Sequence, residues 1–338
     1  MNHITDITPE PLSAKLASQL DPLVPTFVLV DPMLGEPLPE LVEAADECAD
    51  LDQLNDARSK VWQGAVFALV LDERIELEAH RHPYLVSVDP LTQALPNSAR
   101  IASEERARAL VQGTAPYRIG GWLQSTRDPQ VLCGEIAGLC SLHTQGGVAR
   151  PARYLRMADR RVLALLRHVL GEQSIGSRLP SLSQWVWLDD AGRLERLSRT
   201  EPTTDKALVI PSVAWSRLAL GSDIHPVRAR WLGMAPDALA DFDRIERALA
   251  HAGTMSTKWP ARFQGSADRQ AWALLYLLFG DLSGQRSIEM LLRQGDPAHP
   301  EGPGEPAEAF HLLFDAAFDV AVRMRLEASR SPTLEENS

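Results

Sequence analysis

Cys133, Cys140 and His143 are the residues of this chain whose types and spacing come nearest to a metal site. They lie at positions i, i+7 and i+10 of a segment with helical periodicity, so a helix would place them on one face. Structural zinc sites instead use close pairs such as Cys-x-x-Cys, with further ligands from elsewhere in the chain. We therefore interpret the two cysteines as small buried core residues and predict no metal ligand.

Two other groups could take part in acid-base chemistry. His80 and His82 are imidazoles two residues apart, and Asp189 and Asp190 are adjacent carboxylates. A catalytic dyad needs its members to converge on one bond, whereas Asp followed closely by Gly192 is typical of a hairpin turn. We therefore predict no catalytic residue. The alternative to a non-catalytic protein is an uncharacterised hydrolase-like enzyme that holds these histidines or Asp189 in a cleft.

The usual nucleotide and nucleophile motifs are absent from the sequence. There is no P-loop and no Rossmann glycine fingerprint, both of which bring backbone N–H groups close to a phosphate. There is also no Gly-x-Ser-x-Gly elbow to expose a nucleophilic serine. The sequence therefore favours a binding protein over an enzyme and predicts no cofactor.

Charge and composition narrow the class of partner. The 338 residues carry a net charge of −11, and residues 1–56 alone hold twelve acidic side chains against Lys15. A nucleic-acid partner is excluded for the chain as a whole, because such binding needs a basic face. The three cysteines show no pairing pattern, and the sequence has no signal-peptide pattern, so we expect a cytoplasmic protein. It also has no run of about 18 apolar residues, so we expect no membrane partner.

The first 200 residues have the pattern of a mixed α/β lobe. A buried strand is expected over residues 26–32, and Ser103 is expected to cap a helix that ends before Gly113. Asp128 and Asp159 are expected to cap two more helices, the first ending at Gly146. The remaining expected strands are 65–71, 84–88, 152–157 and a hairpin over 184–197. This order predicts an α+β (mixed α/β) N-terminal lobe, residues 1–200, with a small mixed sheet.

The rest of the chain has helical character. Residues 201–235 are expected to be a linker, and 236–328 an all-helical C-terminal lobe whose first helix opens at Pro236. Residues 271–279 are apolar on all sides and should be buried. A loop is expected over 295–306, and a disordered tail over 329–338.

Two sets of residues are candidates for contact with a partner. The segment from Arg150 to Arg167 contains six arginines and only one acidic residue, Asp159. The charges of this basic stretch either pair internally or contact a partner. From it we select Arg153 and Arg156. The last helix carries a stripe that is first a core face but could also lie in a partner's groove, formed by Phe310, Phe314 and Phe318.

The N-terminal lobe also resembles a known family. Five segments carry the resemblance: 27–31 (FVLVD), 82–86 (HPYLV), 121–125 (GWLQS), 155–163 (LRMADRRVL) and 185–189 (WVWLD). In order and spacing they resemble the adaptor-chaperones of bacterial type VI secretion systems, which carry toxic effectors to the VgrG spike. The resemblance implies that the signature and structural residues of the family are, in this chain, Asp31, Pro83, Tyr84, Trp122, Arg156, Asp159, Arg161, Trp185, Trp187 and Asp189.

The chain departs from the family pattern at two places. Ala158-Asp159-Arg160-Arg161 stands where a Tyr-Asp-Pro-Arg element is typical, and Pro32 follows Asp31 where a small pair is common. The resemblance implies a non-catalytic adaptor that binds a cognate secreted effector and helps load it onto VgrG.

Trp185 and Trp187 would share one sheet face and pack in the core.

Overall fold

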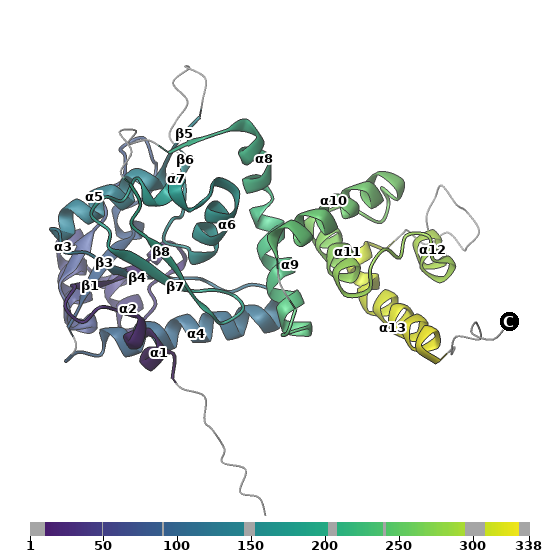
Figure 1. Ribbon diagram of the computed structural model, residues 1–338, viewed down its shortest axis with the longest axis horizontal. Helices are drawn as coiled ribbons and strands as arrows, with labels where there is room; N and C mark the ends of the chain where they lie inside the picture. The colour runs from purple at the N-terminus through teal and green to yellow at the C-terminus, as the bar shows by residue number, and fades with distance from the viewer. Residues whose placement is uncertain are drawn as a thin grey trace, which may run out of the picture. The chain divides into compact units, whose positions relative to one another are not determined.

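The computed structural model describes residues 11–48, 50–89, 91–144, 153–201, 208–238, 241–294 and 308–330. The chain divides into two compact units. The sheet unit comprises Met1–Arg108 and Ala115–Ala219, and the helical unit comprises Ala109–Thr114 and Leu220–Ser338. Figure 1 labels most of the helices and strands of both units. An α+β lobe followed by a helical lobe is thus confirmed.

A six-stranded antiparallel sheet forms the centre of the sheet unit, in the order β2-β3-β1-β4-β7-β8. Its strands are β1 (Thr26–Val30), β2 (Val66–Ala68), β3 (Tyr84–Val88), β4 (Ile119–Gln124), β7 (Gln184–Leu188) and β8 (Leu194–Ser198). A separate three-stranded sheet is the mixed one, because β5 pairs parallel with β9 and antiparallel with β6. Its strands are β5 (Ser141–Thr144), β6 (Arg153–Tyr154) and β9 (Leu208–Ile210).

Both faces of the six-stranded sheet are buried, each in its own hydrophobic core. Trp185 and Trp187 share one core with residues of α5, α6 and α7, while Val186 and Leu188 share the other with residues of α1 to α4. This alternation confirms the predicted packing of the two tryptophans. The helices are α1 (Leu12–Gln19), α2 (Pro39–Glu47), α3 (Leu51–Trp62), α4 (Ala94–Gln112), α5 (Pro129–Cys140), α6 (Arg160–Leu170), α7 (Glu172–Gly176) and α8 (Ser212–Ala219).

Two predicted helix boundaries in the sheet unit were wrong. The helix that was expected to start at Ser103 starts at Ala94, and the Ser103 hydroxyl donates to the Ala99 carbonyl inside it. Pro96 marks the true start, since proline is tolerated in the first turn of a helix. α5 ends at Cys140 rather than at Gly146, because the chain continues directly into β5.

Strand β4 was not predicted, because Gly120 and Gly121 lie within it and glycine weakens strands. The structure shows why both are glycine. A Cβ on Gly120 would lie 2.5 Å from the Ala158 carbonyl oxygen, and one on Gly121 would lie 2.5 Å from the Val186 carbonyl oxygen. These glycines let β4 pack closely against neighbouring backbone.

The helical unit is built around α11, which packs against α9, α10 and α13. Residues 271–279, expected to be buried, form most of α11, and Trp272, Leu274 and Leu275 are in the core. The elements are α9 (Gly221–Met234), α10 (Phe242–Lys258), α11 (Ser266–Phe279), α12 (Arg286–Arg293), the 3-10 turn η3 (Phe310–Leu313) and α13 (Phe314–Arg330).

Where a linker was expected over residues 201–235, the structure has β9, α8 and α9. Pro226 lies inside α9, and an internal proline is ordinarily a sign against a helix. The next helix begins at Phe242 with Asp241 as its cap, not at Pro236, and continues past Gly253 to Lys258. The expected loop over 295–306 lies outside the described residues, as does the tail from 331 onward; α13 itself continues through Arg330.

Candidate functional site

Asp31 and Arg156, two of the signature residues, meet in an ion pair although 125 positions separate them. Asp31 directly follows β1 and is fully buried. Its Oδ2 accepts a hydrogen bond from Arg156 Nε at 2.9 Å and lies 2.8 Å from Arg156 Nη2 in an ion pair. Burial raises the pKa of Asp31, and the charge of Arg156 opposes that rise. The pair thus ties the end of β1 to the segment before α6.

Asp159 extends this network to the start of α6. Its Oδ1 accepts the Arg161 backbone N–H at 3.0 Å, which confirms the predicted cap, and its Oδ2 lies 2.7 Å from Arg161 Nη2. The Arg161 guanidinium lies over the Tyr117 ring at 4.0 Å, and the Tyr117 hydroxyl donates to Asp190 at 2.9 Å. Burial, followed by the charge of Asp190, raises the pKa of Tyr117.

Arg160, which stands where the family pattern has proline, is also used inside the unit. It is 2% exposed, and its Nη1 donates to Glu105 Oε2 and to the Ile119 carbonyl, each at 2.9 Å. Glu105 also accepts from Arg118 Nε at 3.2 Å. This departure from the pattern therefore joins α6 to α4 and β4.

A second buried network surrounds Tyr84. Its hydroxyl donates to Glu36 Oε2 at 2.7 Å, and Glu36 Oε1 accepts from Arg58 Nη2 at 2.6 Å. Burial, followed by the charge of Glu36, raises the pKa of Tyr84. Glu36 and Arg58 were missed at the sequence level, since the pair spans 22 positions and has no motif. The neighbouring signature residue, Pro83, accepts the Leu69 N–H through its carbonyl.

Trp122, Trp185 and Asp189 have hydrogen-bond partners inside the sheet unit as well. Trp122 donates to the Ser98 hydroxyl at 2.9 Å, and Trp185 donates to the Gly120 carbonyl at 3.2 Å. Asp189 accepts the Arg193 backbone N–H at 2.8 Å across the hairpin, as its assignment to a turn predicts.

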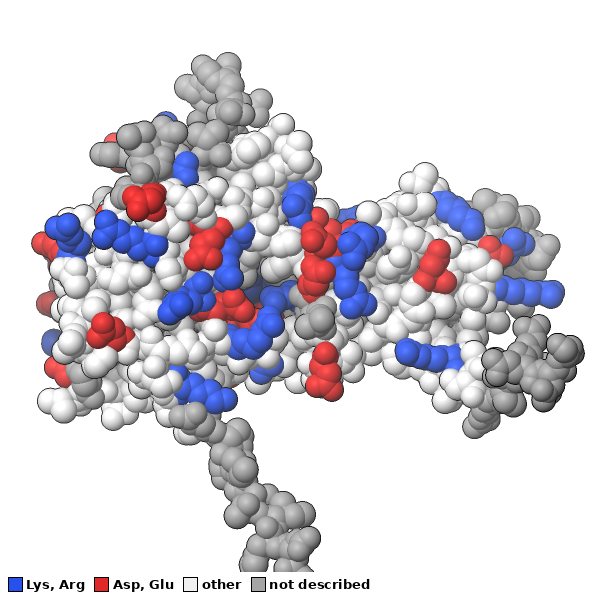
Figure 2. All heavy atoms as spheres, in the orientation of Figure 1, with Lys and Arg blue, Asp and Glu red and all other residues white. Residues whose placement is uncertain are grey.

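The basic stretch is neutralised within the sheet unit as far as the structure describes it. Arg156, Arg160 and Arg161 have the partners given above, and Arg167 Nη1 lies 3.0 Å from Glu195. Figure 2 likewise shows positive and negative side chains intermingled on the face in view. Arg150 and the side chain of Arg153 lie outside the described residues. Contact of Arg156 with a partner stays a prediction.

Among the described side chains, the residues considered for catalysis or metal binding do not form a common ligand set. Both ring nitrogens of His82 face backbone carbonyls, those of Leu69 and Leu77, while the exposed His80 lies 3.6 Å from Glu78. Cys133 and Cys140 are buried in the core, and burial raises the pKa of each thiol to about 12. The side chain of His143 lies outside the described residues.

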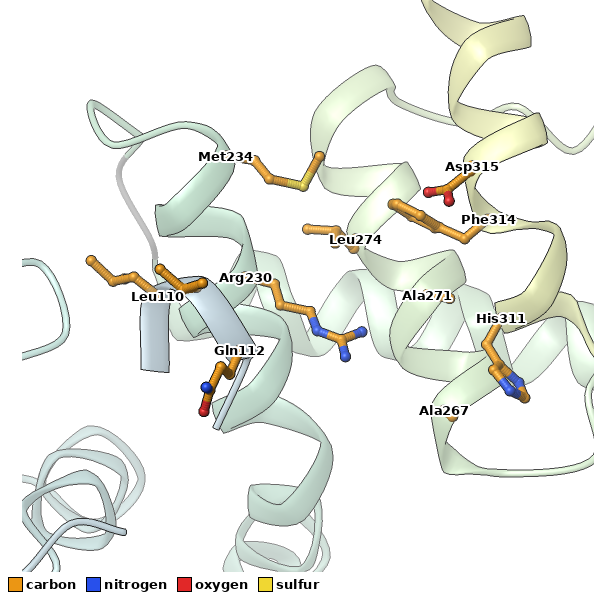
Figure 3. A pocket seen from close by; sticks show the side chains of 11 residues that line it. Leu110, Gln112, Arg230, Met234, Ala267, Ala271, Leu274, His311, Phe314 and Asp315 are labelled. Carbon is orange, nitrogen blue, oxygen red and sulfur yellow. The ribbon is translucent and has the colours of Figure 1, made fainter. Parts of the chain in front are cut away.

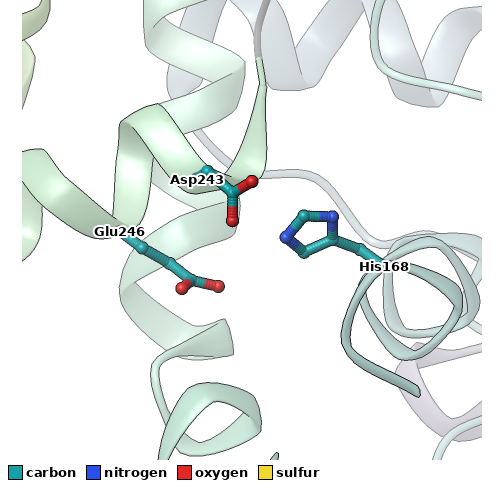
Figure 4. A group of neighbouring side chains, drawn as sticks. All are labelled: His168, Asp243 and Glu246. Atoms are coloured by element: carbon teal, nitrogen blue, oxygen red, sulfur yellow. The ribbon is translucent and has the colours of Figure 1, made fainter. Parts of the chain in front are cut away.

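Figure 4 shows His168 of α6 with Asp243 and Glu246 of α10. Imidazole and carboxylate are metal-ligand types. His168, however, belongs to the sheet unit and the two carboxylates to the helical unit. The three residues are therefore not a ligand set that one folded unit holds in place.

The three phenylalanines that were predicted to lie on the last helix have different surroundings. Phe310 lies in η3, and only Phe314 and Phe318 belong to α13. Phe310 is 1% exposed and stacks on Phe263 with ring centroids 5.1 Å apart, so it belongs to the core. Phe318 packs edge-on against Phe279 at 5.2 Å. Phe314 lines a cavity of about 450 Å³ in the helical unit, shown in Figure 3.

That cavity combines apolar walls with charged groups. Leu110, Met234, Leu274 and Phe314 contribute apolar surface, and Arg230, His311 and Asp315 are the charged or titratable side chains that line it. Pockets of this size with a few polar groups are typical of binding sites. Sequence reasoning missed Arg230, because a single arginine on a helix carries no motif.

No family model matches the chain, and neither a curated protein nor a solved structure matches it. Within the part of the chain that is described, no helix has both the length and the apolar character that a membrane span requires.

Proposed function

We propose that this chain is a non-catalytic adaptor of a type VI secretion system, which acts in the cytoplasm, binds one cognate effector and helps to load it onto the VgrG spike. The observation that carries the proposal is the convergence of the family-like segments. Asp31 from the first segment binds Arg156 from the fourth, and Asp159 of that segment leads through Arg161 and Tyr117 to the hairpin. This network joins the family-like segments in one folded unit, as expected if they form the scaffold of an adaptor.

The polar side chains considered for catalysis already make hydrogen bonds within the protein, which favours an adaptor over a hydrolase. A general base must offer a lone pair to the substrate within hydrogen-bond reach. Asp189 is held by Arg193, and Asp159 is held by Arg161. His82 faces two carbonyl groups. No observation favours a joint catalytic role for these residues.

Co-expression tests the proposal. The full chain is produced together with the secreted toxin encoded beside its gene, with an affinity tag on the toxin only. We expect the two proteins to co-purify and the toxin to be more soluble than when it is expressed alone. An effector from another spike cluster serves as the non-cognate control. A toxin that is equally soluble alone, and that retains none of this chain, would contradict the proposal.

A further inference from the structure

The cavity of the helical unit has an apolar rim that is open to solvent. Its walls come from α9, α11, the start of α13 and the last turn of α4, all within that unit. Val111 is 86% exposed and Met234 is 45% exposed, and both line the cavity. Apolar side chains at the mouth of a cavity offer surface that a ligand can cover.

Arg230 supplies a positive charge in this cavity that forms no direct ion pair with a described carboxylate. Figure 3 shows its guanidinium directed into the space between α9, α11 and α13. Among the residues that the structure describes, no carboxylate lies within ion-pair distance of it and no hydrogen bond holds it. His311, which lines the cavity from η3, is bound through Nδ1 to Asp268 at 2.8 Å. Asp315 also lines the cavity but makes no ion pair with Arg230.

Gly113 fixes the course of the Arg230 side chain. This glycine follows α4 with a φ of +75°, and a Cβ there would lie 2.5 Å from Arg230 Nε and 3.0 Å from its Cγ. Glycine at this position therefore leaves room for the arginine stem to lie across the end of α4 and reach the cavity.

We infer that this cavity binds a short apolar segment of the effector that carries a carboxylate, an inference that rests on the proposed function. Two or more apolar side chains would cover Met234, Leu274 and Phe314, and the carboxylate would accept a bidentate pair of hydrogen bonds from Arg230. A second copy of this chain is the less favoured occupant, because its net charge of −11 would repel an identical chain.

The test compares two cavity variants with matched controls. Arg230→Glu reverses the charge, and Ala267→Trp obstructs the cavity from an exposed position on its wall. The controls are Arg247→Glu and Ala250→Trp, because both residues are exposed on α10 of the same unit and line neither described cavity. Overlapping 15-residue peptides that tile the toxin are the probes, and binding to the full-length chain is followed by fluorescence anisotropy.

We expect one peptide with apolar residues and an acidic residue to bind. Arg230→Glu and Ala267→Trp should each weaken it at least about tenfold, while the controls stay within about twofold of the unchanged chain. Replacing the peptide's acidic residue by lysine should restore binding to Arg230→Glu and abolish binding to the unchanged chain. This exchange identifies the partner of the guanidinium.

Other results overturn the inference. If the toxin co-purifies equally with both cavity variants and no peptide binding depends on Arg230, the effector binds elsewhere and the adaptor proposal alone stands. If the toxin does not co-purify even with the unchanged chain, the adaptor proposal itself fails. If light scattering shows a dimer that Arg230→Glu dissociates, the occupant is a second copy.

Discussion

The sheet unit and the helical unit use their charged side chains differently. In the sheet unit, Asp31, Asp159 and Glu36 each lie within ion-pair distance of an arginine, and all three carboxylates are buried. In the helical unit, Arg230 lines an apolar cavity without a carboxylate partner among the described residues. The comparison indicates that charged side chains of the sheet unit hold its fold together, while Arg230 is the charge that the proposed function would leave available to a partner.

The largest expected effect comes from the aromatic core of the helical unit. Phe310→Ala should lower the free energy of unfolding by about 3–5 kcal/mol, because it removes a ring that packs between Phe263 and Trp272. Phe314→Ala should lower it by about 1 kcal/mol or less, because Phe314 lies at the cavity wall and is only partly buried. Urea denaturation followed by circular dichroism measures both. Equal losses would mean that Phe314 is a core residue and not part of a binding surface.

A similar loss is expected when the buried ion pair of the sheet unit is broken. Arg58→Met leaves Glu36 without its cation, and stability should fall by about 3–5 kcal/mol. The control is Arg100→Met, which removes an exposed pair with Glu104 and should cost less than about 0.5 kcal/mol. Urea midpoints of the two variants give the comparison. A loss at Arg58 as small as that at Arg100 would show that the charges of the sheet unit do not hold the scaffold together.

An intermediate effect is expected at the glycines. Gly120→Ala should cost about 1–3 kcal/mol, because the added Cβ would lie 2.5 Å from the Ala158 carbonyl oxygen and force β4 away from it. Gly138→Ala, inside α5 with nothing within 4 Å of the added Cβ, should instead stabilise the protein by about 0.5–1 kcal/mol. Thermal unfolding should show shifts of opposite sign. Shifts of the same sign would refute the close approach at Gly120.

The smallest effect concerns pH and Asp268 of the helical unit. Burial acts to raise the pKa of this carboxyl, but hydrogen bonds from His311, Gly265 and Gln264 outweigh it and hold the pKa below its ordinary value of 3.8. A lowered folded pKa stabilises the protein above the unfolded value, and this stabilisation is lost as the pH falls through the folded pKa.

Stability should therefore decline between about pH 5 and pH 3, and Asp268→Asn should flatten part of that decline. Asp319→Asn is the control, since the side chain of Asp319 is exposed on α13 and makes no described contact. Urea midpoints at several pH values measure the slopes. Identical slopes for the unchanged chain and Asp268→Asn would contradict the role of these hydrogen bonds.

Local patterns predicted the elements whose signals lie within a few residues. Tyr84–Val88 and Gln184–Leu188 are strands as expected, and Asp128 and Asp159 cap their helices. Strand β4 was not predicted, because its glycines are required by close contact with backbone that is distant in the sequence. Helix α9 escaped because tertiary packing of Ile224, Val227 and Trp231 overrides the local effect of Pro226.

The sites were less predictable than the fold for the same reason. Glu105 and Arg160 are 55 positions apart, and nothing in their local sequence announces that they pair. The arginine stretch looked like a candidate contact surface because charges were counted along the chain, whereas the fold brings acidic residues to it from β1, the hairpin and α4. Arg230 is the converse case, because only the fold shows that it forms no ion pair with any carboxylate among the described residues.

The adaptor account requires a toxin gene beside the gene for this chain, and secretion of that toxin tests the central claim most directly. Bacteria with an active type VI system and an intact toxin gene are compared with and without the gene for this chain, and secreted toxin is measured together with secreted VgrG. The adaptor account predicts that toxin disappears from the medium while VgrG remains, and that expressing this chain again restores the toxin. Equal secretion of the toxin in both strains would contradict the account.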